Sequence, residues 1–410
     1  MATIILTRGH DIRRGTAAND TIFGDVYPTL SSGQGGHDRL SGLGGNDTLY
    51  GDAYRLTARA LGGHDVLSGG IGVDSIFGDA RFMLGSAAGG HDVIAGDAGN
   101  DFLYGDARVM QDLAVGGNDT INGGTGSDLI YGDAYTMAET SRGGQDRING
   151  GADHDRLAGD GQVLSGHAHG GDDRIEGGEA SDRLRGDAWD RLSDDAEGGN
   201  DVLTGGTGND FLIGDASWLE DRARGGDDRL SGGTAVGSAD WMYGDAGTMS
   251  DDAEGGNDRL VGGTTADRMW GDAVTMSGRS QGGDDRLSGG DDDDVMYGDG
   301  QVMSSTAQGG NDVLSGDRGN DQMWGGKGFD RFVFRTGDGI DRIEDFDPHS
   351  GGADADVVDL RGMGIASFAA LMSLTADDTN GDAVITFSAS QRITFIDVAK
   401  ADFSAPDFLL

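Results

Sequence analysis

The sequence predicts a solenoid of about twelve 27-residue coils, closed at its C-terminal end by a small β-rich cap. The tetrapeptide Gly-Gly-x-Asp returns at a nearly constant interval of 27 residues through most of the chain. Glycine supplies 79 of the 410 residues, without the collagen pattern of glycine at every third position. A fixed period of this length is typical of solenoids, in which each unit buries its apolar face against its neighbours.

The repeat begins with an imperfect copy, Arg8-Gly-His-Asp11, and then keeps its register to the end of the period. The spacing departs from 27 residues at two places, by one residue near Trp189 and by three residues within 234–239. Both departures are interpreted as loop insertions, because the register continues after each of them. The Gly-Gly-x-Asp copies start at Gly35, Gly62, Gly89, Gly116, Gly143, Gly170, Gly198, Gly225, Gly255, Gly282 and Gly309.

Each unit has three segments, as residues 116–142 illustrate. The first segment, 116–122, carries Gly-Gly-Asn-Asp-Thr-Ile-Asn, and the third, 132–142, begins with Gly-Asp-Ala. The second segment, 123–131, fits the nonapeptide Gly-Gly-x-Gly-x-Asp-x-U-x, where U is a large aliphatic residue. Further copies of this nonapeptide are Gly69–Phe77, Gly205–Ile213 and Gly325–Val333.

The charge balance excludes several classes of protein. The formal net charge is −42, and 65 Asp stand against 7 Glu, a preference for the shorter acid that indicates turns and metal ligation. Such an acidic chain is not expected to bind nucleic acid. No apolar run approaches a transmembrane span, and the absence of Cys excludes disulfides and thiolate metal sites. Without counter-ions a chain of this charge would be disordered.

The second-segment nonapeptides resemble those of the RTX (repeats-in-toxin, haemolysin-type) calcium-binding family over about residues 8–334. The resemblance implies an all-β parallel β-roll or β-solenoid, in which the glycine-rich part forms a turn and x-U-x a short strand. It also implies calcium between stacked turns, held by the Asp carboxylate and by backbone carbonyls. The usual coil of that family is two nonapeptides long. The additional Gly-Asp-Ala segment is therefore either a third side of the coil or an excursion over one face.

The chemistry of two aspartate ladders agrees with calcium as the cofactor. Carboxylate and carbonyl oxygens suit a hard cation of this size. Adjacent coils lie ~4.8 Å apart, so stacked carboxylates need counter-ions. One ion per ladder in each gap gives roughly twenty Ca²⁺, close to balancing the net charge. The alternative is that these residues only cap turns through side-chain-to-backbone hydrogen bonds.

The predicted metal ligands of the first ladder are Asp20, Asp47, Asp74, Asp101, Asp128, Asp155, Asp182, Asp210, Asp240, Asp267, Asp294 and Asp321. Those of the second ladder are Asp38, Asp65, Asp92, Asp119, Asp146, Asp173, Asp201, Asp228, Asp258, Asp285 and Asp312, followed by Asp330 of the last nonapeptide. A third ladder lies in the Gly-Asp-Ala segments, and for it metal binding and the capping of a bend remain equal alternatives. Its members are Asp25, Asp52, Asp79, Asp106, Asp133, Asp160, Asp187, Asp215, Asp245, Asp272 and Asp299.

Strand alternation predicts an aromatic stripe beside the U positions. Because the residue after U is often aromatic, the second segment is interpreted as a strand covered on both faces and the first segment as half-exposed. We expect a row of Met and Leu side chains in the third segment to cover the stripe. The alternative is an exposed aromatic platform for polysaccharide. The stripe comprises Tyr50, Phe77, Tyr104, Tyr131, Tyr243, Trp270, Tyr297 and Trp324, and the covering row Leu56, Met83, Met110, Met137, Leu164, Leu219, Met249, Met276 and Met303.

Four histidines share the x position of consecutive Gly-Gly-x-Asp copies: His10, His37, His64 and His91. They could form a ladder for a transition metal. From the fifth copy the position holds Asn, Gln or Asp, which favours an exposed and permissive turn position.

The last 76 residues are expected to form a cap, so that residues 1–334 are one domain and 335–410 another. Residues 330–346 continue strands from the roll, and 383–387 and 392–396 are predicted to pair around a Ser-Ala-Ser-Gln turn. The region is similar to the C-terminal part of serralysin-type RTX proteins, and this similarity implies an uncleaved type I secretion signal. The N-terminal apolar run is too short for a secretory signal peptide.

These observations predict a secreted, extracellular and non-enzymatic protein that passes through a type I secretion apparatus and folds on calcium outside. No His-Glu-x-x-His, Gly-x-Ser-x-Gly or phosphate-binding loop occurs. The leading hypothesis is a calcium-binding structural or matrix protein, either free outside the cell or associated with the cell surface. The alternatives are a glycan- or membrane-binding module acting at a host or neighbouring surface, and an alginate-epimerase-like accessory chain.

Overall fold

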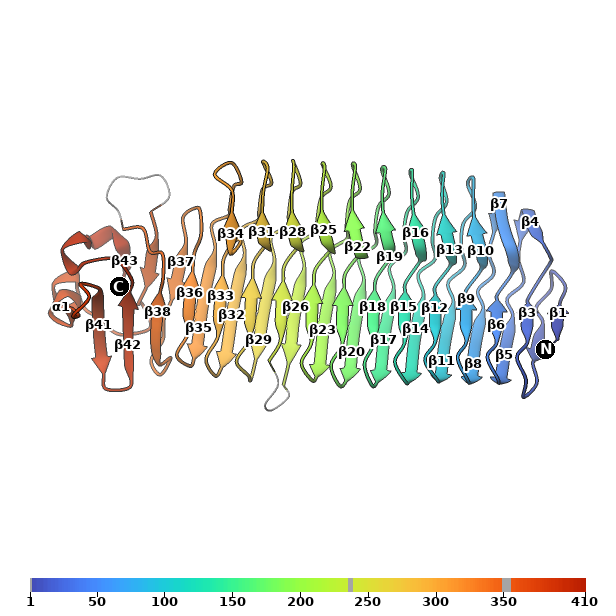
Figure 1. The fold of residues 1–410 in the computed structure, drawn as a ribbon, viewed down its shortest axis with the longest axis horizontal. Coiled ribbons are helices and arrows are strands. Elements are labelled where there is room, and N and C mark those ends of the chain that lie inside the picture. Colours follow the sequence, from blue (N-terminus) through green and yellow to red (C-terminus); the bar gives the residue numbers. More distant parts are fainter. Residues whose placement is uncertain (1, 235–238, 349–354) are drawn as a thin grey trace. The chain divides into compact units, whose positions relative to one another are not determined.

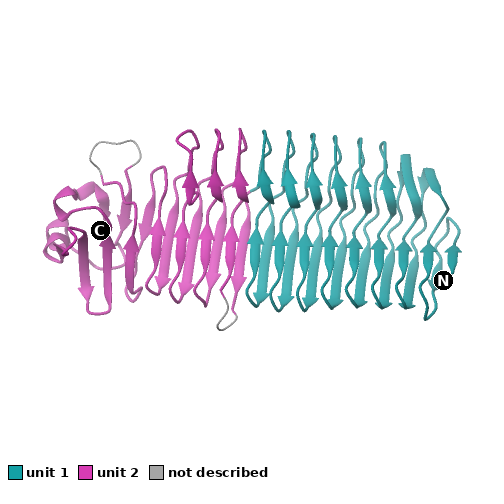
Figure 2. Cartoon of the chain, in the orientation of Figure 1, with its two compact units in different colours: residues 1–226 teal, residues 227–410 magenta. Residues whose placement is uncertain are grey.

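The computed structural model describes residues 2–234, 239–348 and 355–410. It confirms the predicted class, an all-β parallel solenoid with coils of about 27 residues and almost no helix (Figure 1). The turns number about 13, because strands paired in the same way also precede the first full Gly-Gly-x-Asp copy and follow the last one. The chain comprises two compact units, residues 1–226 and 227–410 (Figure 2).

Unit 1 contains three parallel sheets, one for each segment of the repeat, and successive coils add one strand to each sheet. Sheet 1, from the first segments, comprises β2 (Ile12–Arg14), β5 (Arg39–Gly44), β8 (Val66–Ile71), β11 (Val93–Ala98), β14 (Thr120–Thr125), β17 (Arg147–Ala152), β20 (Arg174–Glu179) and β23 (Val202–Thr207). Sheet 2, from the second segments, comprises β1 (Thr3–Ile5), β3 (Thr21–Phe23), β6 (Thr48–Tyr50), β9 (Ser75–Phe77), β12 (Phe102–Tyr104), β15 (Leu129–Tyr131), β18 (Arg156–Ala158), β21 (Arg183–Arg185) and β24 (Phe211–Ile213). Sheet 3, from the third segments, comprises β4 (Thr29–Gln34), β7 (Ala53–Leu61), β10 (Ala80–Met83), β13 (Ala107–Met110), β16 (Ala134–Met137), β19 (Gly161–Leu164), β22 (Ala188–Leu192) and β25 (Ala216–Leu219).

The burial of each strand follows its sequence pattern. In β14 Ile121 is buried, whereas its neighbours Thr120 and Asn122 are exposed. In β15 the U residue Ile130 and the following Tyr131 are both buried. The first segment is therefore half-exposed and the second is covered on both faces, as predicted.

The Gly-Asp-Ala segment is a third side of the coil. The N–H groups of Gly132 and Asp133 donate to the carbonyls of Ala158 and Asp160, so the hydrogen-bond ladder of sheet 2 continues without a break into sheet 3. The return limb is also paired, since Leu61, Ala88 and Val115 form successive parallel bridges. Both limbs of the segment are thus paired with the neighbouring coils, so the segment is a side of the coil and not an excursion over one face.

The two departures from the 27-residue spacing have different outcomes. The extra residue near Trp189 is a β-bulge, at which the register between β19 and β22 shifts. The three-residue insertion within 234–239 falls mainly on residues 235–238, which lie outside the described residues.

Unit 2 repeats the same three-sided coils and then loses the third side. Its sheet 1 comprises β26 (Arg229–Gly233), β29 (Arg259–Gly263), β32 (Arg286–Asp291), β35 (Val313–Arg318), β37 (Arg331–Val333), β39 (Val357–Asp359) and β43 (Phe408–Leu409). Its sheet 2 comprises β27 (Trp241–Tyr243), β30 (Arg268–Trp270), β33 (Val295–Tyr297), β36 (Gln322–Trp324), β38 (Ile340–Ile343), β42 (Gln391–Phe395), β41 (Ala383–Ser388) and β40 (Thr375–Asp377). Its sheet 3 comprises β28 (Ala246–Met249), β31 (Ala273–Met276) and β34 (Val302–Met303).

The C-terminal residues of unit 2 cover the edges of the last coils. As predicted, β37 and β38 continue the roll in parallel, and β41 and β42 form an antiparallel hairpin. β42 pairs with β38, and β43 pairs with β39. Helix α1 (Phe368–Ser373) and the short 3₁₀ turns η1 (Lys400–Asp402) and η2 (Ala405–Asp407) complete this region, packed around Phe346, Phe395, Phe403 and Phe408.

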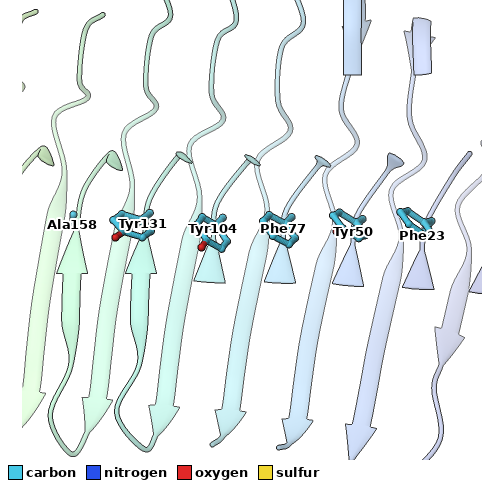
Figure 3. Packing of buried hydrophobic residues seen from close by; sticks show 6 residues of the cluster. All are labelled: Phe23, Tyr50, Phe77, Tyr104, Tyr131 and Ala158. Atoms are coloured by element: carbon cyan, nitrogen blue, oxygen red, sulfur yellow. The ribbon is translucent and has the colours of Figure 1, made fainter. Parts of the chain in front are cut away.

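The aromatic stripe is buried in unit 1, where it begins at Phe23 (Figure 3). Its rings stack from coil to coil, with ring centroids 4.7 Å apart between Phe77 and Tyr104. The predicted covering row is not what packs against it. Met83 and its equivalents are buried, but the side chains that pack against the stripe are Tyr54, Leu129, Tyr135 and Trp189. In the strands of sheet 3 the first Ala and the last Met are buried and the two residues between them are half-buried, so strict alternation does not hold there.

Candidate metal centres

The first aspartate ladder lies at the turn between sheet 1 and sheet 2. The N–H of Asp101 donates to Asp128 Oδ1 at 2.8 Å, and the N–H of Asp128 donates to Asp155 Oδ1 at 2.8 Å. Each side chain therefore holds the backbone of the preceding coil. Asp128 is 2% exposed, and its Oδ2 has no hydrogen-bond partner among the described residues.

Glycines make the space into which these oxygens point. A Cβ on Gly123 would overlap Asp128 Oδ2 and the carbonyl oxygen of Gly150 in the next coil. The open side of the glycine is thus lined by one carboxylate oxygen and one carbonyl oxygen. We name this recurring arrangement the turn site.

The second ladder lies just before the strands of sheet 1, where the chain passes close to the residues that follow the strands of sheet 2. We call this part of the coil the waist. The N–H of Asp119 donates to Asp146 Oδ1 at 2.7 Å, and Asp146 Oδ2 has no hydrogen-bond partner among the described residues. A Cβ on Gly132 would overlap this Oδ2 and the carbonyl oxygen of Gly159. We name this arrangement the waist site.

The third ladder reaches the same waist. The N–H of Gly144 donates to Asp133 at 2.9 Å for Oδ1 and 3.1 Å for Oδ2, and the N–H of Gly171 donates to Asp160 Oδ1 at 3.0 Å. These bonds hold the bend at which the return limb rejoins sheet 1. The capping role that the sequence left open is therefore present.

Burial raises the pKa of the ladder carboxyls. At the turn it raises the pKa of Asp128 to about 7 and that of Asp155 to about 6, against the lowering effect of the backbone N–H each accepts. At the waist burial raises the pKa of Asp133 and Asp160 well above the usual range, and neighbouring carboxylates raise it further. Charged aspartates in these positions need a cation nearby.

All 24 aspartates that the sequence predicted as ligands have buried side chains. Asp20 differs from the rest in its partners. Its Oδ1 accepts the N–H of Ala2 and its Oδ2 accepts both the N–H and the hydroxyl of Thr16, which lowers its pKa. Asp20 is thus a turn cap in the contacts it makes.

Two aspartates of the C-terminal region extend the ladders and were missed in the sequence. The N–H of Asp321 donates to Asp341 Oδ1 at 3.2 Å, and the N–H of Asp330 donates to Asp356 Oδ1 at 3.1 Å. A signal was present for Asp341, since residues 337–343 read Gly-Asp-Gly-Ile-Asp-Arg-Ile and keep the end of a nonapeptide. A signal was present for Asp356 as well, since residues 351–359 read Gly-Gly-Ala-Asp-Ala-Asp-Val-Val-Asp and fit the nonapeptide with Asp in place of its third glycine.

The histidines stack in a row, with ring centroids 4.8 Å apart between His37 and His64. His10, His64 and His91 are exposed and His37 is half-buried. The Nδ1 of His37 accepts the N–H of His64 at 2.7 Å, so one ring nitrogen is committed to the backbone. The position is at the surface, as predicted.

The donor set fits a hard cation. Among the described residues no three carboxylate or imidazole side chains converge on one point, so carbonyl oxygens have to complete each site. Buried carboxylate oxygens without partners beside backbone carbonyls are ligands that calcium accepts, whereas magnesium demands stricter geometry and keeps its waters. The turn and waist sites therefore fit calcium.

Fold and sites together define a metal-binding parallel β-solenoid. The chain matches the RTX calcium-binding nonapeptide repeat family over more than half of its length, in residues 32–53, 57–80, 86–107, 114–134, 141–162, 167–188, 195–218, 252–273, 280–301 and 306–332. It belongs to this family and is a calcium-binding repeat protein. No curated protein matches the chain. In the described part of the chain, no helix has the length and apolar character needed to cross a membrane.

Proposed function

We propose that this chain is a secreted, non-enzymatic structural or matrix protein that folds on extracellular calcium after type I export. The observation that carries the proposal is the buried column of carboxylate oxygens, such as those of Asp128 and Asp146, that have no hydrogen-bond partner within the described residues. The free energy of calcium binding is then also the free energy of folding. In this account the type I secretion apparatus is the first partner, and residues 335–410 are the cap that carries the export signal.

The charge of the chain supports the coupling of export to folding. At −42 the metal-free chain repels itself and stays extended where calcium is scarce. Roughly twenty Ca²⁺, one per turn site and one per waist site in each gap, would offset most of that charge. The absence of Cys suits a chain that crosses a channel unfolded.

The test is a calcium titration of the full chain after chelation, followed by circular dichroism and hydrodynamic radius. We expect a cooperative collapse to β-structure in the millimolar range, where extracellular calcium modules bind. Magnesium at the same concentrations serves as the control and should leave the chain expanded. A chain that is already compact and β-rich in excess chelator at neutral pH would overturn the proposal.

A second candidate function, binding of an extracellular glycan, is supported by a groove in unit 1. The groove has a volume of about 690 Å³ and follows the buried aromatic stripe across several coils. Its lining includes Thr21 and Thr48 of sheet 2 and Tyr54, Arg81 and Arg108 of sheet 3. Because the stripe rings stack on one another, they leave no free flat platform, and the hydroxyl and guanidinium groups are the available ligands.

The charge of the groove favours an acidic polysaccharide. Arg108 lies 5.0 Å from the ring centroid of Tyr135, and Arg81 lies 5.9 Å from that of Tyr54. Neither arginine forms an ion pair with a described carboxylate, although the chain carries 72 acidic residues. Guanidinium groups held on aromatic rings are suited to bind carboxylates in pairs of hydrogen bonds.

The glycan candidate is tested with the variant Arg81→Gln/Arg108→Gln at saturating calcium. Short oligogalacturonides should bind the wild type and bind the variant at least about tenfold more weakly, because charge-assisted hydrogen bonds are lost. The matched control Arg147→Gln/Arg174→Gln removes two exposed charges from β17 and β20 and should bind as the wild type does. Equal binding to both variants, or binding to anionic lipid vesicles in place of the oligosaccharides, would contradict this candidate.

A further inference from the structure

The waist of the coil receives two aspartates per coil, whereas the turn receives one. Asp146 reaches the waist from the first segment and Asp133 from the third, and both are buried. A Cβ on Gly143 would overlap both Asp133 Oδ2 and Asp160 Oδ1, so the carboxylates of successive coils flank the same glycine. The waist column therefore has twice as many buried aspartates per coil as the turn column has.

The two waist ladders act on each other electrostatically and are separate from the turn ladder. Asp146 Oδ2 points at Gly132, the residue before Asp133, and Asp133 accepts the N–H of Gly144, two residues before Asp146. The carboxylate of Asp146 accordingly raises the pKa of Asp133. At the turn, the charged neighbours of Asp128 are Asp155 and Asp153, both on the turn side. The chain thus contains two separate columns of buried carboxylates, one at the waist with two aspartates per coil and one at the turn with one aspartate per coil.

Capping does not account for the whole third ladder. Asp160 is fully buried, and although its Oδ1 accepts the N–H of Gly171, its Oδ2 has no hydrogen-bond partner among the described residues. The same holds for Asp187 Oδ2 and Asp272 Oδ2, the latter in unit 2. Burying a carboxylate oxygen without a partner costs free energy of folding. If the residue only capped the bend, we would expect Asn at this position, or an Asp whose second oxygen is exposed to water.

We propose that the Gly-Asp-Ala aspartates are ligands of the waist ions, so that each waist site has two carboxylates and each turn site one. One Ca²⁺ per gap then balances the two waist charges in full, whereas the turn site holds the same ion with a single carboxylate. Because calcium affinity rises with the number of ligand charges and with rigidity, the waist sites bind more tightly and fill first. The nonapeptide pattern does not include these aspartates, and the third side of the coil is what brings them to the site.

The test compares two matched double variants of the full chain: Asp133→Asn/Asp160→Asn at the waist and Asp128→Asn/Asp155→Asn at the turn. Both change the same two coils and remove the same charge, and Asn keeps an oxygen to accept the N–H groups of Gly144 and Gly171. Calcium binding is measured by equilibrium dialysis and calorimetry. The wild type should show two classes of site. The waist variant should lose ions from the tight class, with affinity falling at least about tenfold there, and the turn variant should lose ions only from the weak class.

The inference rests on the proposed calcium-dependent folding. The results for the wild type and for the waist variant distinguish a failure of that proposal from a failure of the inference. A wild type that binds no calcium overturns the proposed function. A wild type that binds calcium while the waist variant keeps its full tight class shows that the third ladder only caps the bend, and overturns the inference alone. If the double variant does not fold, the single variant Asp160→Asn is titrated instead, and the same loss from the tight class is required.

Discussion

In calcium-free buffer the protein should gain β-structure as the pH is lowered from about 8 to about 5, and lose it again when the pH is raised. Burial raises the pKa of Asp128 to about 7 and that of Asp182 to about 8 in the folded chain. The same groups in the unfolded chain titrate near 3.9. Between these values the folded state binds more protons than the unfolded state, so its stability falls as the pH rises.

The effect should be large because many buried carboxyls share the same direction of shift. Protons then substitute for calcium at low pH, and calcium substitutes for protons at neutral pH. Circular dichroism in chelator over this pH range measures the gain, at protein concentrations low enough to avoid association near the isoelectric point. The control is the same series at saturating calcium, in which β-structure should be present throughout. A metal-free chain that stays disordered from pH 8 to pH 5 would contradict the prediction.

The solenoid and the first two aspartate ladders could be predicted because their residues recur in the sequence at an almost constant interval. A Gly-Gly-x-Asp copy every 27 residues fixes which aspartates stack, and the structure places Asp101, Asp128 and Asp155 one coil apart in that order. Alternation likewise fixed the burial of Ile121 and Ile130. Local pattern was sufficient here because each coil packs only on its neighbours.

Features that depend on how the three sides meet could not be predicted. The sequence shows that Asp133 repeats, but not that it returns to Asp146 at the waist, because the two come together only when the third side folds back. The packing partner of the aromatic stripe was mistaken for the same reason. Met137 and Tyr135 differ by two positions in β16, yet Tyr135 packs on the stripe and Met137 does not. The burial pattern of β16 departs from strict alternation, so a period of two could not identify the residue that packs on the stripe.

The substitution Gly132→Ala should destabilise the calcium-loaded protein by at least about 3 kcal/mol, the upper end of what overpacking usually costs. The added Cβ would overlap the carbonyl oxygen of Gly159 and Oδ2 of Asp146. Neither atom can move aside freely, because the first belongs to the backbone of the next coil and the second is held by the bond from Asp119 to the other carboxylate oxygen. The variant should also lose calcium at the adjacent waist site, since the methyl group occupies space between its oxygens.

The matched control is Gly44→Ala in β5, where the nearest atoms to an added Cβ are the carbonyl oxygen of Ile71 at 3.8 Å and the Cα of Ala17 at 3.9 Å. Its backbone does not need a positive φ, so the methyl group fits, and the loss of unfolded-state freedom should stabilise the protein by about 0.4–1 kcal/mol. Urea unfolding at saturating calcium measures both changes. Opposite signs for the two variants mean that the waist glycines are required for the space they leave to oxygen ligands. Equal stability of Gly132→Ala and the wild type would mean that this space can widen, and that the waist is not a fixed ion site.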